Sequence, residues 1–490
     1  MPENINFNEI PVDIRTPGQY IEVDNSRALK GLPTQGRRLL IMGQRLAAGT
    51  VAQAVPTRIT SAAAAINAFG RGSQLANMVA AAKAANAYTE MWAVALDDNV
   101  AGVAAAHTLT LSGVVAAAGT LRLYVGSVRV EAAVAAGEAN ATTATNLAAA
   151  INANLDLPVT AAAVGAVVTV TCRHKGEMGN ALDLRVNYYA DDASPVGLAV
   201  AVAQSVVGTG NPDVVTAFAS LGGDQYYSIV SAWSDSANLA ACEAEMSTRW
   251  GPMAQRTGHV FAGVAGTYGT LAALGSARNS PHTTLIGAKK VPTSPWILAS
   301  VLGAVCEFHG AIDPARPFQT LVLPGVLPPS ITDRFTLEER GLLLRDGIST
   351  FTVDPDGTMR IERVITTYQT NAYGIEDISY LDLETKWTVD YIRYAVRARI
   401  ALRYPRFKLA DDGTQFAAGQ AIVTPRMIRA ELFGLFRELE EVGLVENFDQ
   451  FKADLIVVRS DADPSRVNAV IPPDVVNQFR VFAAAVQFRL

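Results

Sequence analysis

The sequence is poor in cysteine, histidine and net charge. Three cysteines and five histidines occur among 490 residues, and the cysteines (Cys172, Cys242 and Cys306) are widely spaced. So few cannot form a disulfide framework, which favours a reducing compartment. The formal charge is −6, from 40 Lys and Arg against 46 Asp and Glu. This balance argues against a dedicated nucleic-acid coat, so no nucleic-acid partner is expected.

Long hydrophobic runs of the kind that enter a membrane are also missing. Residues 1–4 do not begin a basic segment followed by an apolar run, so no secretory signal is predicted. The segments 99–121 and 257–277 lack charged side chains, but they consist mostly of Ala, Gly, Thr, Ser and Val. They contain too little Leu, Ile and Phe for insertion. We expect a soluble protein made in the cytoplasm, with no membrane insertion.

The motifs of common enzymes and metal sites are not found. The sequence has no phosphate-binding GxxxxGK[ST] loop and no GxSxG nucleophile motif. Gly263, Gly266 and Gly269 follow a predicted strand, but their spacing differs from GxGxxG, and close helix–strand packing explains them better. Cys306 and His309 form one CxxH pair, whereas a zinc site needs four ligands. No catalytic, cofactor-binding or metal-binding residue is therefore predicted.

The sequence does contain ample material for buried cores. Half of its residues are hydrophobic, and the length predicts about two to four domains. Apolar strands alternate with helices in the stretches 27–98 and 210–345, which is typical of a doubly wound, largely parallel sheet in one α/β core domain. The predicted strands are 38–42, 91–96, 226–231, 259–264 and 283–287, and the predicted helices are 61–69, 74–86, 212–221, 235–250, 267–278 and 295–309.

The segment between these stretches, 99–209, has a different pattern. Two tight hairpins are predicted, at 121–130 around Gly126 and at 159–172 around Gly165, with a helix over 143–154 between them. Turn-rich sequence bounds the segment on both sides. We interpret it as a separate α+β domain inserted into an exposed loop of the core, which predicts that it projects outward.

A further α+β domain is predicted over 346–474. It begins with a hairpin whose strands, 349–353 and 358–367, flank a Pro- and Gly-containing turn. Helices follow over 385–404 and 425–442, the second with Thr424 as N-cap and Pro425 at its first position. Residues 475–490 then alternate as a strand that is apolar on both faces. Such a strand needs a sheet to join, because a free one is an aggregation edge.

Basic side chains are concentrated on the two predicted helices of this last domain. Residues 385–408 carry seven Lys and Arg against one Asp, and Arg393 and Arg397 are four residues apart, so their charges stack. On the next helix Arg426, Arg429 and Arg437 share a stripe opposite the apolar face. An acidic surface on a partner would reduce the repulsion between these like charges. A solvated face partly neutralised by nearby glutamates is the alternative, and the sequence leaves both open.

Several short motifs, in order along the chain, resemble those of contractile phage tail sheath proteins, and most closely the Mu-like tail sheath family. The resemblance covers both ends and most of the middle, and the segment 99–209 is its least diagnostic part. The motifs are TPGQYIE at 16–22 (a PGxYxxE-type opening), DNSRA at 24–28, LLIMGQR at 39–45, NAYG at 371–374, YLD at 380–382, RYPR at 403–406 and the final strand 475–490.

The resemblance implies a structural protein and not an enzyme. Subunits of this family form stacked hexameric rings around a tail tube, and sheath contraction drives the tube through the target cell envelope. The implied partners are other copies of the chain, the tail tube protein, and the baseplate and tail terminator proteins; no cofactor is implied. The implied location is the virion tail, assembled in the cytoplasm of the bacterial host.

The resemblance further implies that residues 1–26 and 475–490 are N- and C-terminal arms that add β-strands to a sheet of a neighbouring subunit. The domain 346–474 would lie near the tube, with the core and the inserted domain progressively further out. The candidate arm residues are Ile10, Val12, Ile14, Tyr20, Val475, Phe479, Val481, Phe482, Val486 and Phe488. The candidate tube-facing residues are Arg393, Arg397, Arg426, Arg429 and Arg437.

The expected fold class is thus α/β and α+β multidomain. It combines a doubly wound α/β core, an inserted outer α+β domain, a C-terminal α+β domain and extended β-strand arms at both ends. Two alternatives stay open. One is an α/β enzyme with an accessory domain, which only the doubly wound middle supports; the other is the sheath of a tailocin or a secretion system instead of a phage.

Overall fold

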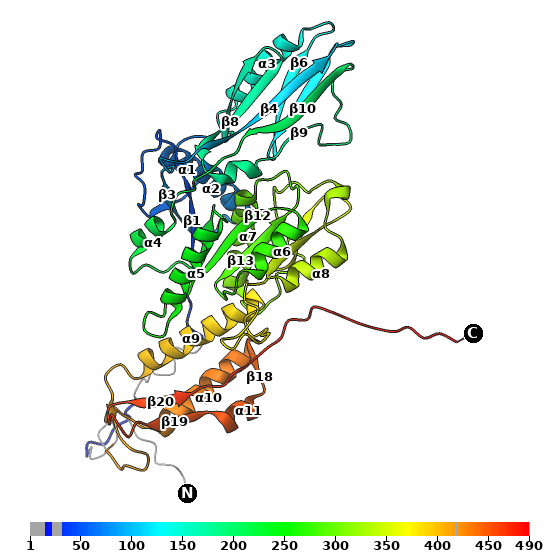
Figure 1. Ribbon diagram of the computed structural model, residues 1–490. Coiled ribbons are helices and arrows are strands. Elements are labelled where there is room, and N and C mark those ends of the chain that lie inside the picture. The colour runs from blue at the N-terminus through cyan, green and yellow to red at the C-terminus, as the bar shows by residue number, and fades with distance from the viewer. Residues whose placement is uncertain (1–14, 22–31, 418, 490) are drawn as a thin grey trace. The chain divides into compact units, whose positions relative to one another are not determined.

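The computed structural model describes residues 15–21, 32–417 and 419–489. The chain divides into two compact units. Figure 1 shows the chain coloured by residue number, from blue at the N-terminus to red at the C-terminus. The core unit comprises residues 37–313 and 318–386. The C-terminal unit comprises residues 1–36, 314–317 and 387–490. Each unit is described below by itself.

The core unit is built on an eight-stranded mixed sheet. The strand order is β15-β14-β13-β12-β11-β1-β3-β2. The six inner strands are parallel to one another, and the outermost strand at each end is antiparallel. The strands are β1 (Arg38–Gln44), β2 (Thr57–Ile59), β3 (Glu90–Leu96), β11 (Ser228–Ser231), β12 (His259–Ala265), β13 (Thr283–Ala288), β14 (Ile348–Val353) and β15 (Met359–Arg363).

Helices cover both faces of this sheet. On one face, Ala262 of β12 packs in a cluster with Leu239 and Leu271, which lie on α5 and α6. The next residue, Gly263, points the other way, and a Cβ added to it would lie 2.0 Å from the Pro295 carbonyl oxygen of α7. Close helix–strand packing therefore explains Gly263, as predicted. The helices are α1 (Ala62–Phe69), α2 (Gln74–Ala85), α4 (Val215–Leu221), α5 (Ser236–Trp250), α6 (Tyr268–Ser276), α7 (Pro295–Ile312) and α8 (Leu337–Arg345).

The helix α7 is the one helix among the described residues that is both long and strongly apolar. By length and composition it could cross a membrane, but 72% of its 18 residues are buried inside the molecule. That degree of burial is typical of a core helix packed on a sheet, and α7 contacts β11, β12 and β1.

The segment 99–209 forms two further sheets. One has the order β10-β4-β8-β7 and the other β6-β5-β9, and both predicted hairpins, β5–β6 and β7–β8, are present. The helix α3 lies on β7, β8 and β6. The elements are β4 (Ala104–Gly113), β5 (Gly119–Val125), β6 (Val128–Val134), α3 (Asn140–Ala153), β7 (Val159–Val164), β8 (Val167–Lys175), β9 (Leu184–Val186) and β10 (Leu198–Val206).

Residues 346–386 belong to the core unit and not, as predicted, with the C-terminal helices. The hairpin β14–β15 is present where expected, but β14 also pairs in parallel with β13, with Leu285 opposite Ile348. The pairing partner is distant in sequence, so the local hairpin signal could not reveal it. The last segment of the C-terminal unit therefore starts at Trp387 and not at residue 346.

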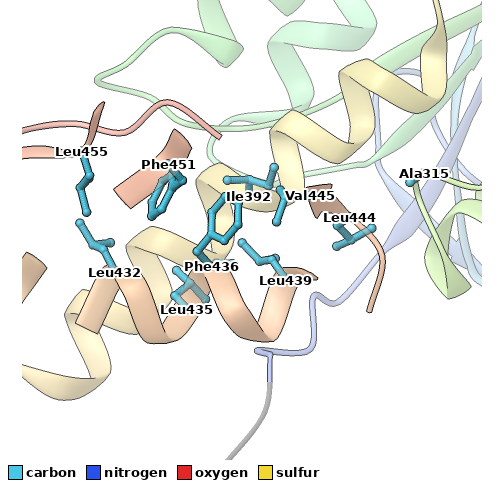
Figure 2. Packing of buried hydrophobic residues seen from close by; sticks show 11 residues of the cluster. Ala315, Ile392, Leu432, Leu435, Phe436, Leu439, Leu444, Val445, Phe451 and Leu455 are labelled. Atoms are coloured by element: carbon cyan, nitrogen blue, oxygen red, sulfur yellow. The ribbon is translucent and has the colours of Figure 1, made fainter. Parts of the chain in front are cut away.

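The C-terminal unit combines helices with three small strand pairs, β16–β17, β18–β21 and β19–β20. Figure 2 shows its core, where Phe436 of α10 stacks on Phe451 with ring centroids 4.1 Å apart, beside Ile392 of α9. The Thr424 side chain accepts a hydrogen bond from the Met427 N–H, which confirms the predicted N-cap. The elements are α9 (Leu383–Arg403), β16 (Lys408–Leu409), β17 (Ile422–Val423), α10 (Pro425–Glu441), β18 (Val445–Glu446), α11 (Phe448–Asp454), β19 (Ile456–Arg459), β20 (Val467–Val470) and β21 (Asp474–Val475).

Candidate assembly surfaces

The end of the chain is an apolar segment without secondary structure of its own. Val475 lies in β21, which pairs with β18 opposite Val445, and the Val476 N–H donates to the Leu444 carbonyl oxygen at 3.3 Å. Residues 477–489 then form neither helix nor strand. Their large apolar side chains are exposed to a degree that a folded chain rarely tolerates: Phe479 72%, Val481 80%, Phe482 80%, Val486 91% and Phe488 80%.

The strand predicted over 475–490 is therefore formed in this single chain only at its first residue. The alternating pattern of the remainder, with aromatic and β-branched residues, is that of a strand. Exposing it costs free energy at about 25 cal/mol per Å² of apolar surface, so a partner that covered it would bind favourably. The strand character of this segment in an assembly stays a prediction.

The N-terminal candidates are only partly described. Ile10, Val12 and Ile14 lie outside the described residues. Tyr20 is 44% exposed, and its hydroxyl donates to the Thr16 carbonyl oxygen at 3.1 Å. Ile21 beside it is 87% exposed. The described part of this arm forms neither helix nor strand and presents apolar side chains, as the C-terminal arm does.

A small sheet with open edges lies in the C-terminal unit. β19 and β20 pair only with each other among the described strands. Val457 of β19 packs against the hydrophobic cluster of Figure 2, whereas Ile456, Val458 and Val470 are 53%, 49% and 58% exposed. A two-stranded sheet is marginal by itself and its edges can accept further strands. The sequence prediction missed this sheet because four-residue strands carry too short a pattern.

Some basic side chains of α9 and α10 are neutralised by nearby glutamates, in line with one of the two interpretations that the sequence left open. Arg399 of α9 is buried between Glu431 and Glu438 of α10, with the Glu431 oxygen 3.0 Å away. Burial, which lowers the pKa of Arg399, is outweighed by the hydrogen bonds to these glutamates, so its pKa is raised. Arg403 shares Glu431 at 3.4 Å. These charges hold the two helices together and are not offered to a partner.

The candidate arginines of α10 are exposed. Arg437 pairs with Glu440 at 2.6 Å and lies over the Phe448 ring, 3.5 Å from its centroid. Arg429 donates to the Lys452 carbonyl oxygen at 3.1 Å, and Arg426 is exposed in the first turn. Arg426 and Arg437 are eleven residues apart, about three helical turns, so they lie on the same side.

The two candidates on α9 differ in their surroundings. The Arg393 side chain is 29% exposed and 4.0 Å from Asp390, whereas Arg397 is exposed. All three candidate arginines of α10 are therefore exposed, whereas of the two candidates on α9 only Arg397 is.

A buried ion pair secures the first residue of the core unit. The guanidinium of Arg37 donates to both carboxylate oxygens of Glu307, at 2.8 and 3.2 Å, and to the Gly310 carbonyl oxygen at 2.6 Å. Glu307 is fully buried in α7 and also accepts from the Ser228 hydroxyl at 2.5 Å. Burial raises the pKa of Glu307, and Arg37 opposes that shift. The sequence analysis missed this cluster because its members are 270 residues apart.

No catalytic or metal centre is found in the described part of the chain. No group of three or more His, Cys, Asp or Glu residues in it could hold a metal ion. Cys306, half of the CxxH pair, is fully buried in α7, and burial raises the pKa of its thiol well above the ordinary value. The features that stand out are the exposed apolar side chains of the chain end and of β19–β20.

Comparisons with known proteins give a consistent result. Residues 208–367 match the phage tail sheath protein central domain, and residues 376–489 match the phage tail sheath C-terminal domain. The Mu-like prophage FluMu tail sheath protein of Haemophilus influenzae is 42% identical over 487 residues, which cover 99% of this chain and all of that protein.

Two solved structures of sheath proteins align with most of this chain. The sheath of an extracellular contractile injection system, PVC, in its contracted state aligns with a TM-score of 0.50 and 10% identity, over 97% of this chain and 98% of that chain. The sheath tail protein Lin1278 of Listeria innocua aligns with a TM-score of 0.49 and 11% identity, over 92% and 94% of the two chains.

Proposed function

Because this chain belongs to the phage tail sheath family and is a structural subunit of a contractile sheath, we propose that its terminal arms join the subunits into one contractile polymer. The observation that carries this proposal is the C-terminal segment 477–489, which has no strand of its own and exposes a row of large apolar side chains. Residues 1–26 serve as the corresponding N-terminal arm.

The arms act by strand addition. The segment 477–489 of one subunit lies along an open edge of β19–β20 in another subunit, where backbone hydrogen bonds give affinity and alternate side chains give register. The exposed Ile456, Val458 and Val470 of that sheet are supporting evidence, since an added strand would cover them. Flexible links of this kind keep subunits connected while rigid bodies rotate and slide during contraction. The sheath subunits form hexameric rings stacked around the tube.

The basic face of α10 binds the tail tube. Arg426, Arg429 and Arg437 are exposed on it, and an acidic tube surface complements them. Exposed ion pairs are each worth about 0–1 kcal/mol, so several together hold the sheath on the tube and can be released one after another as the sheath contracts. Arg393 and Arg397 of α9 are secondary candidates, because Arg393 is only 29% exposed and lies 4.0 Å from Asp390 of its own helix.

Reversal of these charges is expected to impair sheath–tube assembly more than folding. R426E/R429E/R437E should leave the circular dichroism spectrum close to that of the unchanged chain and lower the unfolding midpoint only modestly, because all three side chains are exposed and only Arg437 loses an ion pair, with Glu440. It should abolish co-sedimentation with tube protein. The matched control is R58E/R129E/R345E, three exposed arginines of the core unit. Normal tails from the α10 variant would refute the tube-facing assignment of this helix.

The segment 99–209 serves as an outer domain that assembly does not need. Its two ends lie side by side: the Val103 N–H donates to the Thr209 carbonyl oxygen at 2.8 Å, and the reverse bond is 3.1 Å. A short turn can therefore replace everything between them. In this arrangement residues 27–98 and 210–345 form the middle layer, and 346–474 include the part near the tube.

Replacement of residues 104–208 by Asn-Gly, a two-residue hairpin turn, is expected to give a soluble chain that still forms contractile tubes. Asp98 loses the hydrogen bonds from His174 and the Lys175 N–H, but water can replace them once the segment is gone. The measurement is negative-stain electron microscopy of polymerised protein. An insoluble or unfolded product would show that the segment is part of the core.

The partners and location follow from this role. The chain binds other copies of itself, the tail tube, and the baseplate and tail terminator proteins at the two ends of the sheath. It acts in the virion tail and is assembled in the host cytoplasm. It performs this work without catalysis or a cofactor. Electron microscopy of the chain polymerised with its tube protein tests the proposal: striated tubes of two lengths and widths support it, and a chain that stays monomeric with tube and baseplate present refutes it.

A further inference from the structure

The C-terminal arm is longer than the strands that receive it in the strand addition proposed above. Its segment 477–489 has thirteen residues, whereas β19 and β20 have four residues each. A strand rises about 3.3 Å per residue, so the segment spans about 43 Å and each receiving strand about 13 Å. Even a paired region twice as long as β19 ends at residue 484. Residues 485–489, the distal arm, therefore run past their partner strand and need another surface to cover Val486 and Phe488.

The core unit carries an apolar groove between the helix α8 and the segment 368–381. Its volume is about 770 Å³, and its apolar lining consists of Leu342, Leu344, Ile378 and Leu381. Leu342 is 39% exposed and Ile378 is 72% exposed, so the groove is open to solvent. Pockets that bind ligands have volumes of about 300–1,000 Å³. The groove is therefore large enough to take up an aromatic side chain and the backbone that carries it.

One wall of the groove is held in place by hydrogen bonds. The Asn279 amide donates to the Thr370 carbonyl oxygen at 2.8 Å, and its oxygen accepts from the Thr370 N–H at 3.1 Å. The Gln369 amide donates to the Gly275 carbonyl oxygen at 3.0 Å, and the Tyr368 hydroxyl donates to a carboxylate of the same wall. A wall fixed in this way loses little conformational entropy when a ligand binds.

The rim of the groove is acidic. The charged residues that line the groove are Glu338, Glu376, Asp377, Arg345 and Arg363. The guanidinium of Arg363 is already neutralised, because it donates to both carboxylate oxygens of Asp382, each at 2.9 Å. The remaining lining charges are three carboxylates and the guanidinium of Arg345. The rim is therefore complementary to a ligand that carries positive charge beside an apolar group.

Charge distinguishes the two arms as occupants of this groove. The distal arm contains one charged side chain, Arg489, and the segment 477–489 contains no Asp or Glu. The N-terminal arm, residues 1–26, contains five Asp and Glu against one Arg. An acidic rim attracts the first arm and repels the second. In an extended chain Phe488 and Arg489 point to opposite sides, so one can enter the groove while the other meets its rim.

We propose that the distal arm of one subunit binds this groove in another subunit, with Phe488 in the groove and Arg489 at the acidic rim. The proposal rests on the strand addition described above and gives the arm a second binding site. Burial of the Phe488 ring supplies affinity, and the exposed ion pair supplies orientation more than affinity. A segment held at two sites binds more tightly than at either alone, because the second contact forms within an existing complex.

Chemical cross-linking of full-length chains tests the proposal. G341C adds a thiol to the groove, where a Cβ on Gly341 would meet no atom within 4 Å, and Q487C adds one to the distal arm. The native cysteines are buried. The two variants are mixed, polymerised with tube protein and treated with a short bismaleimide, so a 341–487 link joins two different chains. The matched control replaces G341C by V215C, since Val215 is 53% exposed on α4, which does not line the groove.

The expected result is a 341–487 link at about fivefold or more the yield of the 215–487 link. R489E in the Q487C chain should lower the yield about fivefold, the effect of one exposed ion pair. E338K/E376K in the G341C chain should then restore it, because the two charges are exchanged. A yield that R489E leaves unchanged would overturn the proposal. So would a link from I10C to G341C in place of the 341–487 link, which would make the N-terminal arm the occupant.

A second cross-link separates this proposal from the strand addition on which it rests. V458C on β19 and V481C in the arm report that pairing, and Val458 is 49% exposed in the single chain. Both links are expected in the polymer. A 458–481 link without a 341–487 link would overturn the groove as the site of the distal arm and leave strand addition standing. The absence of both links would overturn strand addition and this proposal together.

Discussion

Two prolines in the C-terminal arm are expected to abolish polymerisation and leave the subunit folded. The variant is A483P/A484P. Proline cannot donate a backbone hydrogen bond and is excluded from paired strands, and because alternate residues of a strand point their N–H groups to opposite edges, two consecutive prolines interrupt both edges. The arm has no secondary structure in the single chain, so its own folding should not suffer.

The matched control is A483S/A484S, which changes the same two positions but keeps both N–H groups. Sedimentation and negative-stain electron microscopy measure polymerisation, and thermal unfolding measures the subunit. A483S/A484S should polymerise nearly as the unchanged chain does. Deletion of residues 477–490, which leaves the bond between Val476 and Leu444 in place, should reproduce the proline result. Normal tubes from A483P/A484P would show that the arm does not join the subunits by strand pairing.

Loss of Arg37 is expected to destabilise the core unit by about 3–5 kcal/mol, the usual cost of removing one partner from a buried ion pair. R37A would leave the carboxylate of Glu307, which is 0% exposed, with only the Ser228 hydroxyl as a hydrogen-bond donor among the contacts described above. It would also remove the bond to the Gly310 carbonyl oxygen at the end of α7. The measurement is the urea unfolding midpoint of the full-length chain.

The matched control is R45A, which removes a guanidinium from a pair whose carboxylate, on Asp97, is 46% exposed. Such pairs contribute about 0–1 kcal/mol, so R45A should shift the midpoint little. The double variant R37M/E307M should recover much of the loss, because apolar side chains of similar size leave no buried charge. Equal midpoints for R37A and R45A would contradict the anchoring role of Arg37.

Local sequence signals predicted the elements of the fold well. The parallel strands β1, β3, β11, β12 and β13 lie where continuous apolar runs indicated them, and the mixed α/β class with several sheets is confirmed. Thr424 caps α10 as its position predicted. These features depend on residues close together in the sequence, where hydrophobic period and capping chemistry suffice.

Features that depend on distant residues could not be predicted in this way. The hairpin β14–β15 has a clear turn signal, but only the pairing of Leu285 with Ile348 assigns it to the core sheet. Arg399 looks like its neighbours on the helix, and only the packing of α9 on α10 reveals that it pairs with Glu431. For the arms, the apolar pattern of residues 475–490 indicated the need for a partner sheet, but a single sequence does not identify that sheet.

The most direct test of the central claim, that the arms join the subunits, is a cryo-electron microscopy reconstruction of assembled tails in which the main chain can be traced. The account predicts that residues 477–489 of each subunit form a strand beside β19 or β20 of a different subunit, in both the extended and the contracted sheath. A reconstruction in which this segment folds back onto its own chain, or in which it contacts no other subunit, would contradict it.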